Sequence, residues 1–201
     1  MFIELAEYLR CPHPHEETFL VLSTGAMRSR HVLFGTLGCP VCHAEFPVLD
    51  GVARFGEPGP VPGPAAGAPP ADAAAVGALL GLESPGGYAV LVGSAGGLAG
   101  ALGDVLDRVH LICVNPPAVP PLALMRSVLQ APDFIPLRSG VVRGVVLGAE
   151  SAKNPWLEEA ARVLLHGQRL VALTETVAAP PALRTMAVGK GMWVGRKSQG
   201  G

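Results

Sequence analysis

Three of the four cysteines in this 201-residue chain are spaced as metal ligands are. Cys39 and Cys42 form a Cys-x-x-Cys knuckle, which places two thiolates on one side of a tight turn, as tetrahedral zinc requires. A second knuckle should supply the other two ligands, but around Cys11 the sequence reads Cys-Pro-His-Pro-His. A histidine must then replace a cysteine. We favour His15 over His13, because the wider spacing leaves the imidazole more room to turn back to the metal, and His13 stays open as the alternative.

A second candidate site is the Gly-rich turn Gly93-Ser94-Ala95-Gly96-Gly97, which follows the apolar strand signal YAVLV and opens a helix. Glycines let the backbone approach a ligand closely, and N–H groups at the start of a helix favour negatively charged groups. Two interpretations remain open: a pocket for a nucleotide-like cofactor, or a strand-to-helix turn kept for packing alone. The candidate cofactor-binding residues here are Gly93, Ser94, Gly96 and Gly97.

The charge balance argues against a polyanionic ligand. There are 15 basic and 16 acidic residues, for a formal net charge of −1, and neither sign forms a long run. Nucleic acid is therefore not favoured as the main ligand. The apolar stretches are broken before the roughly 20 residues that cross a bilayer, and the N-terminus lacks the features of a signal peptide. We expect a cytoplasmic protein without membrane attachment, in which cysteines bind metal or are buried rather than forming disulfides.

The composition divides the chain into two parts. Residues 56–72 are rich in proline and glycine and are predicted to be a linker. Before them, FLVLS and HVLFGTL have the pattern of strands, and Asp50-Gly51 between two apolar runs is a strong two-residue hairpin signal. Residues 1–55 are thus predicted to form a small β module.

After the linker, residues 73–201 alternate strand and helix signals, in the order YAVLVG, GGLAGALGDVLDRV, HLICV, VVRGVVLG, NPWLEEAARVLLHG and QRLVAL. Such alternation predicts a mainly parallel sheet covered by helices. The final MWVGRK is predicted to be the last, edge strand. The run from Glu158 to Arg162 is predicted to be the solvated face of a helix.

The first part resembles a known family. LRCP near the start and LGCPVCHAEFPVLDGVARF at the end, with two short strands between them, resemble the small zinc-ribbon family that activates tRNA and translation-factor methyltransferases. The resemblance covers about residues 5 to 55 and implies a zinc-ribbon-like β module that binds zinc and covers an apolar surface of a catalytic subunit. One departure is Pro14, which stands where the first knuckle of the family has its second cysteine.

The second part resembles the S-adenosylmethionine-dependent class I methyltransferases. PDFIPLRSGVVRGVVLG is similar to their loop and fourth strand, and EEAARVLLHGQRLVAL to the helix, turn and strand that follow. The resemblance covers most of residues 75 to 197 and implies a shortened Rossmann-like, mainly parallel sheet. It also implies S-adenosylmethionine as the cofactor, held at the Gly-rich turn.

Several cofactor contacts of that family are weakened in this chain. Leu91 stands where the first strand usually carries an acidic residue, and Ala95 is the middle residue of the turn, usually glycine. Asn115 occupies the neighbourhood of the carboxylate that binds the ribose hydroxyls, and an amide lacks the charge that strengthens such bonds. The acidic residue near the adenine amine aligns with Ala131, although Asp133 could take the role.

We therefore expect a methyltransferase-family protein with an eroded cofactor site and no catalytic residue of its own. It would act as a scaffold or regulator that binds a protein partner, or on whose second domain the ribbon docks. The alternative is an active S-adenosylmethionine-dependent methyltransferase with a built-in zinc-ribbon activator. An NAD-type dehydrogenase is disfavoured, because the turn lacks GxGxxG followed by an acidic residue about 20 positions on.

Overall fold

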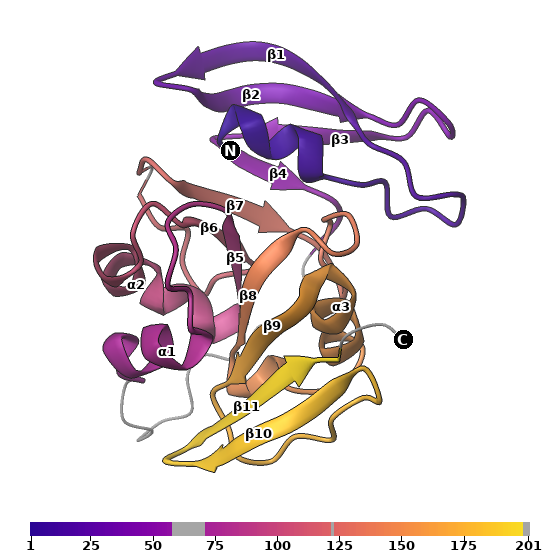
Figure 1. Cartoon of the computed structure of the whole chain (residues 1–201). Coiled ribbons are helices and arrows are strands. Elements are labelled where there is room, and N and C mark those ends of the chain that lie inside the picture. Colours follow the sequence, from indigo (N-terminus) through magenta and orange to yellow (C-terminus); the bar gives the residue numbers. More distant parts are fainter. Residues whose placement is uncertain (58–70, 122, 199–201) are drawn as a thin grey trace.

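The computed structural model describes residues 1–57, 71–121 and 123–198. These residues form one eleven-stranded sheet in the order β1-β2-β3-β4-β7-β6-β5-β8-β9-β11-β10, with short helices packed on it (Figure 1). The predicted linker, residues 56–72, falls largely on residues 58–70, which lie outside the described residues. None of the described helices is long and apolar enough to cross a membrane.

The N-terminal part is an antiparallel ribbon preceded by a short 3-10 helix. Its elements are η1 (Ile3–Tyr8), β1 (Val21–Arg28), β2 (His31–Gly38), β3 (Glu45–Leu49) and β4 (Val52–Arg54). Asp50 and Gly51 join β3 to β4 with φ angles of 50° and 81°, the left-handed backbone of a two-residue hairpin turn. The strands and the hairpin predicted from the sequence are confirmed.

The second part is a doubly wound α/β unit. Its parallel strands run in the order β7-β6-β5-β8-β9, so that the first strand in sequence lies in the middle, as in Rossmann-like sheets. The mainly parallel sheet predicted from the sequence is thus confirmed. The elements are α1 (Ala73–Leu80), β5 (Tyr88–Val92), η2 (Gly93–Leu98), α2 (Ala99–Val105), β6 (His110–Val114), β7 (Arg126–Gln130), β8 (Val142–Leu147), η3 (Ala149–Ser151), α3 (Trp156–Val163), β9 (Leu164–Ala172), β10 (Leu183–Gly189) and β11 (Met192–Lys197).

The prediction of an edge strand at MWVGRK is wrong. This segment is β11, which lies between β9 and β10 and runs antiparallel to both. Trp193 and Val194 are buried in this inner position, whereas six of the seven residues of β10 are exposed. Composition does not explain this order, because β10 (LRTMAVG) is richer in apolar residues than β11 (MWVGRK) and still forms the exposed edge.

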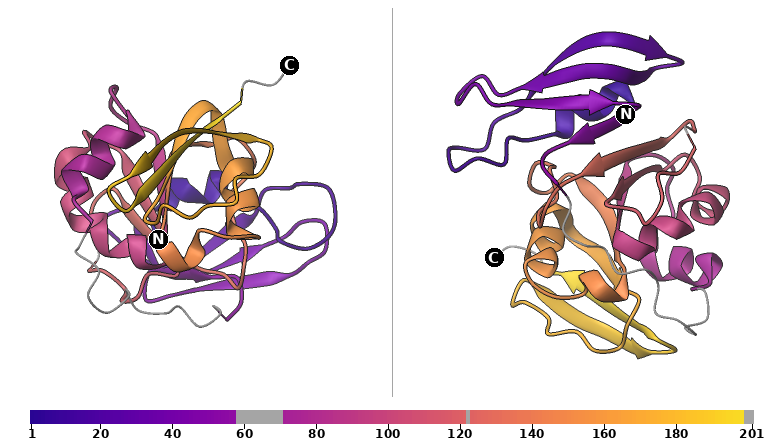
Figure 2. Two further views of the ribbon diagram at one scale, coloured as in Figure 1. Left: turned by 90° about the horizontal axis from the view of Figure 1, so that it is seen from below. Right: turned by 180° about the vertical axis from the view of Figure 1, so that it is seen from behind.

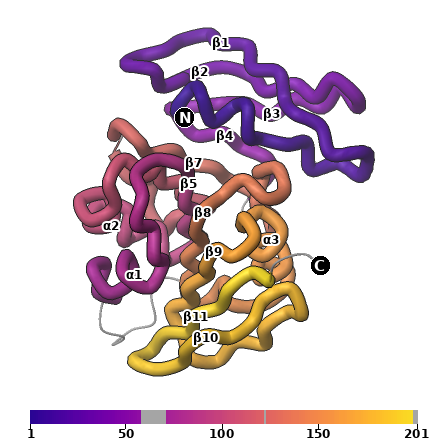
Figure 3. The backbone as a smooth tube through the Cα atoms, in the orientation of Figure 1, coloured from indigo at the N-terminus to yellow at the C-terminus, as the bar shows by residue number. Residues whose placement is uncertain are grey.

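The ribbon and the α/β unit share one continuous sheet. β4 pairs in parallel with β7, with Val52 opposite Val128 and Arg54 opposite Gln130, and the N–H of Phe55 then donates to the carbonyl of Gln130 at 2.7 Å. Figure 2, right, shows β4 and β7 side by side where the two parts meet, and the backbone trace of Figure 3 shows the ribbon as a layer over that edge. The ribbon is therefore docked on the same chain.

The hydrophobic core follows the same continuity. One buried cluster lies beneath α1 and α2 and includes Cys113. The other runs from the ribbon, through the segment after β7, to α3, and includes Leu5, Leu37, Val48, Ile135, Leu137 and Leu157. A module of about 50 residues has little core of its own. Here the ribbon shares a core with the rest of the chain.

A polar network also joins the two parts, and it corrects the prediction for the run from Glu158 to Arg162. The side chains of Glu159 and Arg162 are only 16% and 21% exposed, because α3 turns them towards the junction. Arg162 donates to the Glu159 carboxylate at 2.7 Å and to the carbonyl of Leu137 at 2.7 Å. Burial favours the neutral carboxyl, but Arg162 outweighs it and lowers the pKa of Glu159. From the ribbon, Glu17 accepts a hydrogen bond from the Ser139 hydroxyl at 2.8 Å.

Candidate functional site

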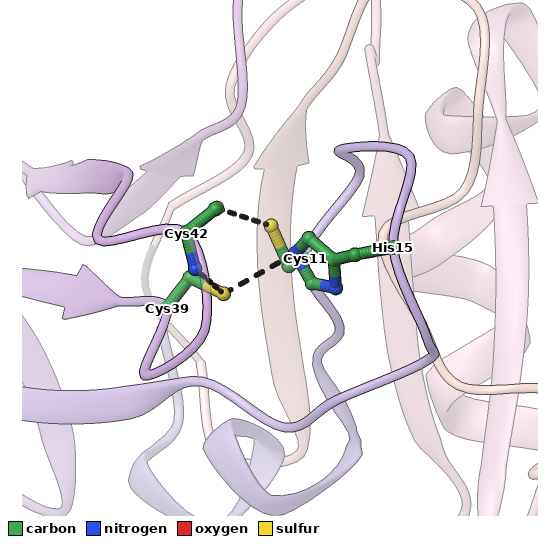
Figure 4. A group of neighbouring side chains, drawn as sticks. All are labelled: Cys11, His15, Cys39 and Cys42. Carbon is green, nitrogen blue, oxygen red and sulfur yellow. Dashed lines mark hydrogen bonds between the residues drawn. The ribbon is translucent and has the colours of Figure 1, made fainter.

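Two loops of the ribbon bring three thiols and one imidazole together. Cys11 and His15 belong to the loop before β1, and Cys39 and Cys42 to the turn between β2 and β3. One ligand atom from each of the four lies within 4.8 Å of all the others, and Figure 4 shows the side chains facing one another. The sulfurs of Cys11 and Cys42 are 3.6 Å apart. A tetrahedral zinc ion with Zn–S bonds of about 2.3 Å holds two sulfurs about 3.8 Å apart. The cluster can therefore hold a metal ion.

The hydrogen bonds of His15 orient it as a metal ligand. Its Nδ1 lies 2.7 Å from the carbonyl oxygen of Glu16, and a carbonyl only accepts, so Nδ1 carries the proton. The lone pair is then left on Nε2, which lies 3.4 Å from the Cys39 sulfur. A ring nitrogen fixed by a carbonyl in this way is typical of metal-binding histidines.

His13 has a different position. Its Nδ1 lies 3.4 Å from the Cys42 sulfur, and its ring packs edge-on against Phe46, but it is not part of the group of four. The structure thus brings the residue favoured by spacing, His15, into the cluster and leaves His13 beside it.

The thiols of the cluster differ in acidity. Burial opposes ionisation of Cys39, but the backbone N–H groups of Cys42 and Val41 favour its thiolate and lower its pKa to about 6. Burial and the neighbouring thiols raise the pKa of Cys11 to about 12. The backbone N–H groups of the Cys-x-x-Cys turn therefore stabilise a negatively charged sulfur even without a bound cation.

The Gly-rich turn lies where Rossmann-like folds bind ligands. It forms η2 directly after β5, and the end of β5 pairs with the end of β8, so the turn stands at the carboxyl end of the strands where the strand order reverses. Gly93 has a φ of 62°, a left-handed conformation that favours glycine. The predicted strand-turn-helix context is confirmed.

In this structure a side chain of the same chain occupies the start of that turn. Glu150, in η3 after β8, accepts a hydrogen bond from the Ser94 N–H at 2.7 Å and another from the Ser94 hydroxyl at 2.8 Å. A Cβ added at Gly93 would collide with this carboxylate and lie 2.7 Å from the Ser151 hydroxyl oxygen. The N–H group that could bind an anionic ligand is already paired with a carboxylate.

The rest of the turn is partly covered. A Cβ added at Gly96 would lie 2.7 Å from the Cβ of Pro116, which follows β6 and packs directly on the glycine. Gly97 is exposed, and a Cβ there would meet nothing within 4 Å. Side chains of Glu150, Ser151 and Pro116 thus cover Gly93 and Gly96, whereas Gly97 stays uncovered.

Asn115 is buried, and both polar atoms of its side chain are hydrogen-bonded to the backbone of Ala131. Its Nδ2 donates to the carbonyl of Ala131 at 2.6 Å, and its Oδ1 accepts from the N–H of Ala131 at 3.0 Å. The amide therefore continues the pairing of β6 with β7 by one more position, which a carboxylate could not do because it has no donor. Asp133 lies on the exposed loop after β7.

Sequence reasoning named Ser94 but missed both residues that cover the turn. Glu150 is a single acidic residue in a short turn after a strand, and its position in the sequence does not indicate a contact with the Gly-rich turn. Pro116 follows the strand signal HLICV, and its local sequence does not indicate a contact with the turn. Both contacts depend on how β6 and β8 lie beside β5, which the local sequence does not specify.

The comparisons with known proteins are limited to structure. No protein family and no curated protein matches the sequence. Among similar solved structures is a complex of the Haloferax volcanii Trm112 methyltransferase activator with a methyltransferase, at 20% identity and a TM-score of 0.39, covering 50% of this chain and 50% of that chain.

Two further similar structures match at lower identity. The antibiotic-resistance methyltransferase Kmr is 13% identical, with a TM-score of 0.46, over 69% of this chain and 98% of that chain. A SAM-dependent methyltransferase from Aquifex aeolicus is 16% identical, with a TM-score of 0.44, over 63% and 88%. The chain spans only 44% to 50% of the length of the first three structures that it matches.

Proposed function

We propose that this chain is a non-catalytic, methyltransferase-like scaffold whose ribbon is docked on its own sheet and which serves to bind a protein partner. The single observation that supports this most is the carboxylate of Glu150 on the Gly-rich turn. The division into a ribbon (1–55), a linker (56–72) and a Rossmann-like domain (73–201) belongs to this proposal.

Glu150 would compete directly with the cofactor. S-adenosylmethionine carries an amino-acid carboxylate, and a cofactor bound at this turn would place a second negative charge beside that of Glu150. Displacing Glu150 breaks two hydrogen bonds to a charged group, each of which contributes about 1.5–3 kcal/mol. The amide of Asn115, already paired with Ala131, offers no charge to the ribose hydroxyls in return.

The docked ribbon supports a scaffold in a second way. β4 covers the edge of β7, and the network of Glu17, Glu159 and Arg162 ties the ribbon to α3 and its neighbouring loop. An activator-like ribbon therefore has its docking surface within the same chain. A protein partner would meet other surfaces of the described molecule.

Zinc is the metal that we propose for the cluster of Cys11, His15, Cys39 and Cys42. A structural zinc ion has four protein ligands and stabilises the folded state by binding it alone. It would neutralise the thiolates and hold the loop before β1 to the turn between β2 and β3. The residues that bind and orient it are those of the cluster, with the Glu16 carbonyl holding the ring of His15.

The decisive experiment is calorimetric titration of S-adenosylmethionine and S-adenosylhomocysteine into the wild-type chain, Glu150→Ala and the control Glu158→Ala. We expect no saturable binding to the wild type or the control. If Glu150 is the main obstacle, Glu150→Ala gains weak binding, in the range of about 0.1–1 mM. Micromolar binding to the wild type would refute the scaffold.

The alternative function is an active methyltransferase, and one observation favours it. The turn keeps its place at the reversal of strand order, and Gly97 is uncovered there. In an enzyme Glu150 would have to swing away when the cofactor binds. The same titration separates the two, since an enzyme would bind the cofactor without any substitution.

A further inference from the structure

Three arginines stand in one row across neighbouring strands at the far end of the sheet. Arg169 of β9 is directly opposite Arg196 of β11, and Arg196 is directly opposite Arg184 of β10. Residues directly opposite in an antiparallel pair point to the same face, about 4.5–5.5 Å apart between Cβ atoms. The three side chains therefore start from one line on one face of the sheet.

No carboxylate of the described residues neutralises this row. Arg169 donates to the carbonyl of Leu79 at 3.2 Å, near the end of α1. Arg196 donates through Nε to the carbonyl of Gly167 at 2.7 Å, which leaves its terminal nitrogens without a partner among the described residues. Arg184 is exposed and pairs with no described side chain or carbonyl. Most of the donors of Arg184 and Arg196 are available to a ligand.

The row borders an open pocket. Its volume is about 280 Å³, and its lining consists of Arg184, Arg196, Lys197 and Ser198. Lys197 comes from the other face of β11, where its ammonium group donates to the carbonyl of Leu164 at 2.7 Å. The two arginines thus border one opening, and no described acidic residue belongs to its lining.

Protection of the sheet edge does not account for this arrangement. Charged side chains on an edge strand prevent pairing with other chains, which would explain Arg184 on β10. Arg196 and Arg169 lie on inner strands, where no edge needs protection. Like charges directly opposite each other destabilise a sheet. The row therefore carries a cost that an anion bound beside it would remove.

We propose that Arg184 and Arg196 form a binding site for a small phosphate-bearing compound, distinct from the Gly-rich turn. The planar fork of arginine matches the oxygens of phosphate with two parallel hydrogen bonds. Arg169 lies opposite Gly144 near the start of β8, whereas the Gly-rich turn lies beside its end. The two sites are therefore separated along the strands, and β11 and β10 also lie beyond β9, away from β5. The net charge of −1 favours a small ligand over a nucleic acid.

Calorimetric titration at low ionic strength tests the proposal, with inorganic phosphate and pyrophosphate as separate probes. The double variant Arg184→Gln/Arg196→Gln is compared with the wild type and with Arg28→Gln, an exposed arginine on β1 at the opposite edge of the sheet. We expect saturable binding to the wild type and to Arg28→Gln, weakened about tenfold or more in the double variant. Tighter binding of pyrophosphate would point to a diphosphate group in the ligand.

Thermal unfolding provides a second readout, which distinguishes a phosphate site from arginines that only stabilise the fold. Without phosphate, the double variant should unfold at the same or a higher temperature than the wild type, because like charges have been removed. Adding phosphate should raise the melting temperature of the wild type and of Arg28→Gln, but not that of the double variant. Absence of saturable binding to the wild type, or an equal response of all three proteins to phosphate, would overturn the proposal.

Discussion

The Cys/His cluster and the Gly-rich turn are both candidate binding sites. They differ in whether the groups that would bind a ligand are already paired with another group of the chain. In the cluster, Cys11, His15, Cys39 and Cys42 turn their ligand atoms towards one shared point. In the turn, the N–H of Ser94 is already bonded to a carboxylate of the same chain. Gly93 has its left-handed backbone conformation with or without a ligand, so the glycine pattern alone does not distinguish an open binding site from a turn covered by the chain itself.

The largest effect should come from the metal ligands. Cys39→Ser removes a thiolate from the cluster, and because zinc binding contributes directly to folding, with about 10 kcal/mol or more in isolated zinc modules, the ribbon should lose much of its stability. We expect zinc in the purified wild type, little in the variant, and a melting temperature lower by about 10 °C or more. Elemental analysis and thermal unfolding measure both.

Cys113→Ala is the matched control, since this fourth cysteine is buried beneath α1 and α2, in a different cluster. It should keep the full zinc content. A wild-type protein without zinc, or one whose unfolding is unchanged by a chelator, would remove the contrast between the two sites.

Acid should next destabilise the junction between the ribbon and the α/β unit. His110 lies at their junction, where its Nε2 is 2.9 Å from the Ser127 hydroxyl oxygen, which also accepts from the N–H of Phe2. Burial, with smaller effects of His31 and the terminal amine, lowers the pKa of His110 to about 4, from 6.5. The unfolded chain therefore binds more protons between these values, and stability falls as pH drops from 6.5 to 4, by up to about 3 kcal/mol.

Urea unfolding at pH 7 and pH 4.5 measures this loss in the wild type, in His110→Gln and in the exposed control His43→Gln. His110→Gln should show a smaller loss than the other two. If all three lose the same stability, the acid sensitivity arises elsewhere and the junction does not couple the two regions.

The smallest effect distinguishes the covered and uncovered parts of the turn. Gly96→Ala would force its Cβ against Pro116 and should cost about 1–3 kcal/mol. Gly97→Ala meets nothing within 4 Å and should change stability by no more than about 0.5 kcal/mol. Denaturant unfolding of the two variants compares them. Equal stability would mean that Pro116 does not cover the turn in solution, and the contrast with the cluster would weaken.

The sequence predicted those features that depend on local pattern. The ribbon strands, the Asp50-Gly51 hairpin, the alternation of strands and helices, and the glycine turn after β5 follow from periodicity and turn chemistry. The choice of His15 rested on spacing alone, and the structure places this residue within the group of four. Cys113, the one cysteine outside the predicted knuckles, is buried and free, as we expect of a cysteine that does not bind metal.

The features that were not predicted from the sequence depend on contacts between residues that are distant in the chain. β7 and β10 were not recognised as strands. β7 lies between β4 and β6 in the sheet, but it begins with Arg126, ends with Gln130 and contains only two apolar residues. β10 is almost wholly exposed. The inner place of β11 and the burial of Glu159 follow from packing against distant elements. Glu150 could be found only once β5 and β8 lie side by side.

The pairing of β4 with β7 also has a consequence for the order of events during synthesis. Val52 and Val128, which stand opposite each other, are 76 positions apart in the chain. At about 5–20 residues per second, the ribbon is complete for roughly 4–15 s before its partner strand is made. During that interval β4 is an open edge, and residues such as Leu5 and Leu37 lack the core that they later share. A metal ion bound by the four converging ligands would thus stabilise the ribbon most in the part-made chain, before β7 has been synthesised.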